Sequence, residues 1–246
     1  MTPSDEGIEF LTGAVQPSNP YEGTMQRLLQ AVRLGFIGPG QRLPAERDLA
    51  SMLGVSRTTV REAISTLSEA GYLVPRRGRY GGTFVVDALP GAGRIDGGHE
   101  PLTAGALEDI GVLRRVLEVG AVREAAARGL SAADRETLAI ALEDCGAADA
   151  ADFRRLDSRL HLVFAELSGS SSLVRLLADL RTRVNAALDR IPMLAPNLAH
   201  SREQHEMIAS AIAAGRPDDA AAAMLEHIAG TEALLRGFLE TDGSPR

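Results

Sequence analysis

The segment RLPAERDLASMLGVSRTTVR (42–61) constrains the fold more than any other part of the chain, because its apolar and turn residues predict a helix-turn-helix. Pro44 suits the first turn of a helix, where its missing N–H has no partner to lose. Gly54 suits the left-handed residue that ends this helix. Ser56 can cap a second helix through its side-chain oxygen. The segment therefore predicts two short helices joined by a tight turn.

The second helix of this motif predicts a DNA-facing surface. Val60, Ile64 and Leu67 recur at helical spacing, so we expect them to face the core. Arg57, Thr58 and Arg61 then point outward, at the end that enters a major groove in this motif. Guanidinium and hydroxyl groups suit guanine edges and phosphates. We therefore expect this module to bind double-stranded DNA.

A short β-hairpin is predicted directly after the second helix. The β-prone runs 72–74 and 83–86 flank a glycine-rich turn that carries Arg76, Arg77 and Arg79. A hairpin in this place is a wing, and arginines at its tip suit phosphate or minor-groove contacts. The alternative is a solvated charge cluster.

The winged segment resembles the GntR family of bacterial transcription regulators. The resemblance rests on the motifs GQRLPAERDLA (40–50), LGVSRTTVREAISTLSEAGYL (53–73) and GGTFV (81–85). It implies that operator contacts come from the helix-turn-helix and the wing. The residues concerned are Arg47, Arg57, Thr58, Thr59, Arg61, Arg77, Arg79 and Gly81. For Arg47 the alternative is a local ion pair with Glu46 or Asp48.

Length and charge indicate a two-domain protein. The chain has 246 residues and a formal net charge of −7, yet residues 21–87 hold nine arginines against six acidic residues. A basic module on an acidic body favours one DNA-facing side over general adhesion to nucleic acid. The expected parts are a disordered arm (1–20), the winged helix-turn-helix domain (21–87), a linker (88–104), an all-helical domain (105–240) and a tail (241–246).

Membrane and redox functions are not predicted. No apolar run reaches membrane-spanning length, and the N-terminus lacks a signal-peptide core, so we expect a soluble, cytoplasmic protein with no membrane partner. The single cysteine, Cys145, cannot form a disulfide within the chain.

The region from residue 105 onward has only helical patterns. The predicted helices are 105–128, 131–145, 149–168, 172–191, 198–214 and 217–240. Ser131 with Asp134 predicts a capping box, Gly215 predicts a helix end, and Pro217 predicts the start of the last helix. The fold class is therefore mainly α: a winged helix-turn-helix followed by an antiparallel helical bundle.

One carboxylate and three imidazoles in the bundle form a candidate metal site. Asp157 and His161 stand at i and i+4 and share a helix face. His205 and His227 lie on inward or boundary stripes of two later helices. Such groups suit zinc, nickel, manganese or iron. The alternative for each histidine is a boundary residue satisfied by one neighbour; His200 and His99 are expected to be solvated.

The bundle resembles the FCD effector domain of the FadR subfamily of GntR regulators. The resemblance rests on LRRVLEVGAVREAAAR (113–128), LDSRLHLVFAELSG (156–169), EQHEMIASAI (203–212) and AAAAMLEHI (220–228). In many members of that family an Asp, the His one turn later and two later His bind a divalent metal. The resemblance therefore implies Asp157, His161, His205 and His227 as ligands, with zinc favoured.

A metal with open positions suggests a sensor of a small carboxylate or hydroxy acid. Arg114 is the leading candidate for holding such an effector, with an intrahelical pair to Glu118 as the alternative. Arg183 and Asn185, with Arg181, are further candidates on the fourth bundle helix. The expected mechanism is a homodimeric repressor that binds a palindromic operator.

Two other functions are compatible with this residue set. The metal could be purely structural, with a separate organic pocket. A metal-dependent enzyme would need a placed acid or base, and Glu166, the nearest spare carboxylate in sequence, is expected on a different face from His161. We therefore predict that the chain is not an enzyme.

Overall fold

The computed structural model describes residues 11, 20–78, 81–90, 103–191, 193 and 195–242. The chain divides into two compact units, Met1–Gly98 and His99–Arg246. Arg79, most of the expected arm and linker, and most of the expected tail lie outside the described residues. The architecture is mainly helical with one two-stranded hairpin, as predicted.

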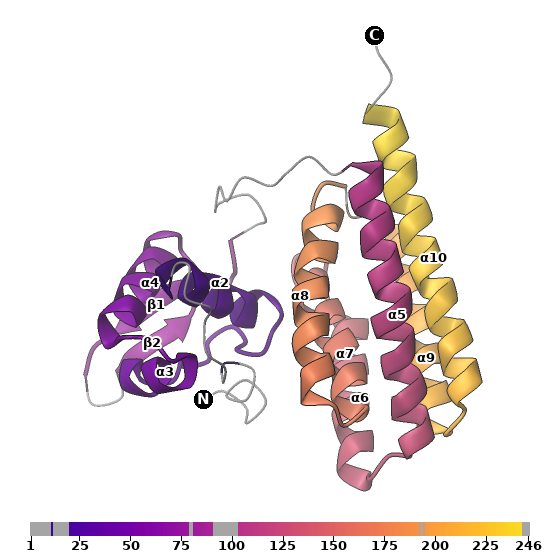
Figure 1. Ribbon diagram of the computed structural model, residues 1–246, viewed down its shortest axis with the longest axis horizontal. Coiled ribbons are helices and arrows are strands. Elements are labelled where there is room, and N and C mark those ends of the chain that lie inside the picture. Colours follow the sequence, from indigo (N-terminus) through magenta and orange to yellow (C-terminus); the bar gives the residue numbers. More distant parts are fainter. Residues whose placement is uncertain are drawn as a thin grey trace. The chain divides into compact units, whose positions relative to one another are not determined.

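The first unit contains the helix-turn-helix. The helices of this unit are α2 (Pro20–Arg33), α3 (Glu46–Leu53) and α4 (Arg57–Glu69), and α3 and α4 form the helix-turn-helix (Figure 1). Gly54 ends α3 with a left-handed backbone (φ 67°), and Ser56 accepts a hydrogen bond from the Thr59 N–H at 3.0 Å. Both predictions are confirmed. The start of α3 was predicted too early: Pro44 lies before the helix, because Ala45 is still extended (ψ 148°).

The predicted hairpin is also present. Strands β1 (Leu73–Arg76) and β2 (Gly82–Val85) pair antiparallel, with Leu73 opposite Val85 and Arg76 opposite Gly82. Leu73 and Val85 are buried, which seats the base of the hairpin in the core of this unit. A Cβ at Gly81 would lie 2.5 Å from the Arg76 carbonyl oxygen, so the residue that leads from the turn into β2 must be glycine.

The second unit is an antiparallel helical bundle. Its helices are α5 (Ala104–Arg128), α6 (Ala132–Ala147), α7 (Phe153–Leu167), α8 (Ser171–Leu188), α9 (Ala195–Ala213) and α10 (Pro217–Asp242). The long helices α5 and α10 lie side by side (Figure 1). The capping box of Ser131 and Asp134 and the helix start at Pro217 are confirmed.

Two helix starts in the bundle differ from the prediction by more than one residue. Helix α7 begins at Phe153, because the Asp149 side chain accepts the N–H groups of Ala151 and Asp152 and holds a turn before the helix. Helix α9 begins at Ala195, three residues before the predicted 198.

The core of the bundle consists of small and aliphatic side chains, including Val122, Leu160, Ile208, Ile212 and Met224, all at most 1% exposed. Alanines such as Ala125 let the helices approach closely. Across the described ranges, no helix is both long and apolar enough to cross a membrane.

Candidate metal centre and DNA-binding surface

The structure brings the four predicted ligand residues together inside the bundle. Asp157 and His161 come from α7, His205 from α9 and His227 from α10, and all four are buried. One potential ligand atom from each lies within 4.8 Å of the others. We call these four residues the Asp/His cluster.

Each imidazole has a different neighbour at Nδ1. The pairs are His161 with Glu118 Oε1 (3.1 Å), His205 with Cys145 Sγ (3.8 Å) and His227 with Gln204 Oε1 (3.0 Å). The Nε2 atoms of His161 and His205 lie 3.9 and 3.3 Å from one Asp157 oxygen. This arrangement leaves Nε2 as the free ligand atom of each of these two rings.

Charge around Asp157 keeps its carboxylate ionised. Burial alone would raise the pKa of Asp157, but neighbouring positive charge, with the Arg181 guanidinium as its largest source, outweighs burial and holds the pKa below its ordinary value. Arg181 donates a hydrogen bond to one carboxylate oxygen, Oδ2. The other oxygen, Oδ1, faces the imidazoles and remains available to a cation.

Two of the three imidazoles, those of His205 and His227, are held neutral. Burial lowers the pKa of His205 to about 4, and it lowers the pKa of His227 well below its ordinary value, helped by His205. Neutral imidazole is the form that binds metals. His205 and His227 are therefore in their ligand form at neutral pH.

These residues fit a divalent metal ion. Three imidazole nitrogens and one carboxylate oxygen are donors used by zinc and by other first-row metals. The Nε2 atoms of His161 and His205 are buried and make no hydrogen bond within the described part of the chain; His161 Nδ1 is also without a hydrogen bond there, although it lies 3.1 Å from Glu118. Buried polar atoms without a partner are costly, and a bound cation would satisfy both Nε2 atoms.

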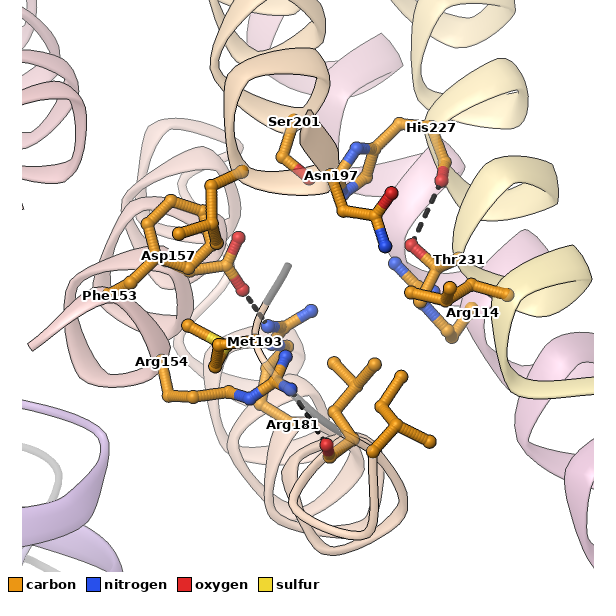
Figure 2. A pocket seen from close by; sticks show the side chains of 14 residues that line it. Arg114, Phe153, Arg154, Asp157, Arg181, Met193, Asn197, Ser201, His227 and Thr231 are labelled. Atoms are coloured by element: carbon orange, nitrogen blue, oxygen red, sulfur yellow. Dashed lines mark hydrogen bonds and ion pairs between the residues drawn. The ribbon is translucent and has the colours of Figure 1, made fainter. Parts of the chain in front are cut away.

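A small cavity of about 60 Å³ adjoins the cluster (Figure 2). Asp157 and His227 form part of its wall, and its cationic side chains are Arg114, Arg154 and Arg181. Neutral polar side chains also line it: Asn197, Ser201 and Thr231. In Figure 2, Asp157 and Arg181 lie on one side of the cavity and His227, Thr231 and Arg114 on the other. The cavity offers cations for a carboxylate beside donors and acceptors for a hydroxyl.

The predicted effector residues divide into two groups. Arg114 lines the cavity and also forms the predicted pair with Glu118, through its Nε at 2.8 Å. Arg183 and Asn185 are not among the residues that line this cavity. Arg183 is exposed and pairs with Asp109 at 2.6 Å, while Asn185 donates a hydrogen bond to Ser158. Helical geometry explains the position of Arg183: Arg181 faces inward, and Arg183, about 200° further round α8, faces outward.

Other sequence expectations can be compared directly. His200 is exposed, as expected. Glu166 pairs with Arg159 and lies outside the cluster. The sequence alone assigns no role in the site to four of its polar residues: Glu118 as a partner of His161, Gln204, Cys145 and Arg154. Gln204 directly precedes His205, but its contact with His227 depends on how α9 packs on α10, so sequence spacing could not reveal it.

The first helix turn of α4 presents polar side chains. Arg57 and Thr58 are exposed, whereas the Thr59 hydroxyl lies 2.8 Å from the Ser56 hydroxyl at the helix cap. Arg61 is exposed and forms an ion pair with Glu46 of α3 at 2.9 Å. An exposed pair of this kind contributes little to stability, so Arg61 is available to a stronger anion.

The other predicted DNA contacts lie beside this turn and in the wing. Arg47 is exposed and contacts Asp48 at 3.1 Å, which is the local pair considered as its alternative. Arg77 is exposed at the tip of the hairpin, close to Gly81. Arg76 instead lies over the Phe84 ring, 4.6 Å from its centre, so part of its charge is used within the wing.

Two family models match this chain. One, described as "Bacterial regulatory proteins, gntR family", matches residues 20–85. The other, described as "FCD domain", matches residues 109–230. The first covers the helix-turn-helix and the hairpin, and the second contains the whole Asp/His cluster.

Known proteins are similar to this chain over most of their own length. The "Putative L-lactate dehydrogenase operon regulatory protein" of Escherichia coli (strain K12) is 32% identical, over 82% of this chain and 80% of the relative. The "HTH-type transcriptional regulator LutR" of Bacillus subtilis (strain 168) is 31% identical, over 85% of this chain and 98% of the relative. A solved structure, "E. coli McbR/YncC", matches with a TM-score of 0.57 at 21% identity, over 90% of this chain and 99% of that one. The last similarity supports the fold alone.

Proposed function

The chain belongs to the GntR family of bacterial regulatory proteins and is a DNA-binding transcription regulator, not an enzyme, and we propose that it represses an operon until a small organic acid binds beside a divalent metal ion. The observation that carries this proposal is the buried Asp/His cluster at the wall of a cavity lined by arginines. Four protein ligands leave positions open on a five- or six-coordinate ion, where an acid could bind.

The metal site consists of Asp157, His161, His205 and His227, and zinc is the favoured ion, with nickel, manganese and iron as alternatives. The test is elemental analysis of untagged protein after incubation with zinc and removal of free metal. We expect about one equivalent in the parent and a large loss in the Asp157→Ala/His205→Ala double variant. The matched control is His200→Ala, which removes an exposed histidine from the same helix, α9. A metal-free parent would overturn this site.

The effector is a short carboxylate or hydroxy acid. Its carboxylate would meet Arg114 and Arg154, and its hydroxyl would meet Ser201 or Thr231. L-lactate is the first candidate, because the relative from Escherichia coli is named for an L-lactate dehydrogenase operon. In calorimetric titrations of the zinc-loaded chain with short hydroxy acids, Arg114→Met should abolish binding, and Arg183→Met, which changes an arginine outside the cavity, should not.

Operator DNA is bound by α4 and the wing. We assign base or phosphate contacts to Arg57, Thr58, Thr59 and Arg61 on α4 and to Arg47 on α3. We assign contacts with the DNA sugar-phosphate backbone to the wing residues Arg77, Arg79 and Gly81. The exposure of Arg57, Arg61 and Arg77 supports this assignment.

A homodimer would present two such surfaces to the half-sites of a palindromic operator. An exposed apolar patch supports this: Val112, Val116 and Leu176 are 48%, 65% and 54% exposed on α5 and α8. The Asp109–Arg183 ion pair joins the same two helices. Val116 and Leu176 each lie two helical turns from that pair. Because the two helices run antiparallel, the two side chains lie at the same height along the bundle.

The dimer has a direct test. Val116→Glu should dissociate it in sedimentation experiments, because a charge would be buried in the apolar contact. Ile140→Glu is the matched control, since Ile140 is similarly exposed (53%) but lies on α6. A parent that sediments as a monomer at micromolar concentration would refute the dimer.

The build of the DNA-binding unit supports repression in the absence of effector. Its helix-turn-helix is held by its own cap, turn and core, so it needs no effector to form. Effector binding then acts by releasing DNA. For this coupling the effector must bind the DNA-free state more tightly, typically by about 1–3 kcal/mol.

A further inference from the structure

Glu118 lies at a junction between the Asp/His cluster and the cavity. It is on α5, and its carboxylate is 1% exposed. One oxygen accepts a hydrogen bond from Arg114 Nε at 2.8 Å. The other lies 3.1 Å from His161 Nδ1 and 3.4 Å from an Arg181 nitrogen. One carboxylate thus contacts a candidate metal ligand and two arginines of the cavity wall.

A carboxylate in this position needs its partners. Burying a carboxylate without compensation is costly, and burial would raise the pKa of Glu118, but Arg114, His161 and Arg181 hold that pKa well below its ordinary value. Glu118 is not itself one of the four clustered ligand residues. Its carboxylate instead contacts Arg114, Arg181 and the Nδ1 side of the His161 ring.

The charges of this group balance without a metal. Arg114 and Arg181 carry two positive charges, while Glu118 and Asp157 carry two negative ones, and all four side chains are buried. The ring of His161 therefore has an anionic neighbour in place before any cation binds. A preassembled ligand avoids the cost of ordering it when the ion arrives.

We propose that Glu118 is the positioning residue of the metal centre: it holds His161 with Nε2 directed at the other ligands and holds Arg114 at the cavity wall. This inference rests on the metal site proposed above. A carboxylate behind a histidine ligand fixes the ring and raises its basicity. Of the three Nδ1 neighbours, Glu118 is the charged one, while Gln204 and Cys145 are weaker acceptors.

The test is zinc affinity, measured on the full chain by competition with a chromophoric chelator. We compare Glu118→Gln with the double variant Glu118→Leu/Arg114→Met, which removes the acceptor and also the arginine left unpaired. The matched control is Glu166→Gln, whose carboxylate pairs with Arg159 away from the cluster. The visible spectrum of bound cobalt reports ligand geometry in the same variants.

We expect the zinc affinity to fall about 10-fold in Glu118→Gln and about 100-fold in the double variant, in the range found for partners of metal ligands. Glu166→Gln should stay within about twofold of the parent, because its partner lies outside the site. The cobalt spectrum should change only in the Glu118 variants. If Glu118→Gln does not fold, the charge-balanced double variant decides the question.

Parental affinity and an unchanged cobalt spectrum in both Glu118 variants would overturn the role of Glu118 while leaving the metal site standing. A parent that binds no zinc would overturn the metal site, and the role of Glu118 with it.

Discussion

Replacing Arg181 by methionine tests whether buried charge balance holds the bundle together. The Arg181 side chain is 1% exposed and pairs with both Asp157 and Glu118. Methionine keeps much of the volume but leaves the two carboxylates with Arg114 as their remaining buried cation. Breaking a buried pair on one side costs about 3–5 kcal/mol. For a domain of this size, that loss lowers the melting temperature by roughly 10–20 °C.

The assay is thermal unfolding of the bundle, followed by circular dichroism in the presence of EDTA. Arg183→Met is the matched control on the same helix: its side chain is 44% exposed and its partner Asp109 is 62% exposed. Exposed pairs contribute at most about 1 kcal/mol, so this control should melt within about 4 °C of the parent. Added zinc should reduce the deficit of Arg181→Met, because the ion supplies positive charge beside Asp157. If Arg181→Met and Arg183→Met have the same melting temperature, buried charge balance does not hold the bundle together.

Three further predictions concern DNA and pH. Arg61→Ala should weaken binding to an operator selected from random DNA by about 1–3 kcal/mol. Arg77→Ala should weaken binding to all DNA sequences alike and reduce the salt dependence by about one phosphate contact. Variant affinities equal to the parent's in fluorescence anisotropy would contradict both predictions. Ser56→Ala removes the cap bond to the Thr59 N–H and should destabilise the first unit by about 1 kcal/mol in urea unfolding. Burial lowers the pKa of His205 to about 4, so the unfolded chain takes up protons first on acidification. Metal-free stability should therefore fall as pH drops from about 6.5 towards 4, by up to ~1.4 kcal/mol per pH unit; a flat profile would contradict the burial of a neutral imidazole.

Local signals made the helix-turn-helix predictable. Gly54 and Ser56 act through their own backbone and side-chain chemistry, so the turn and the cap could be assigned from neighbouring residues alone. The pairing of Asp157 with His161 followed equally from helical spacing. The start of α3 did not, because Pro44 tolerates both a helix start and the extended stretch before one.

Tertiary packing decided what the sequence left open. Arg181 and Arg183 lie two residues apart on a helix with arginines on both faces, so periodicity could not tell which one is buried. The contacts of Glu118, Gln204 and Cys145 with the histidines each join two different helices. No spacing along one helix encodes such contacts, which require the bundle itself.

A small acid, sensed at the metal centre, is proposed to control DNA binding. The most direct measurement is operator affinity with zinc alone, L-lactate alone and both together, in the parent and in Asp157→Ala/His205→Ala. We expect the operator affinity of the parent to fall roughly 5- to 150-fold only when metal and acid are both present, and we expect no response in the double variant. An operator affinity unchanged by zinc with any short hydroxy acid, or an equal response in the double variant, would contradict this proposal.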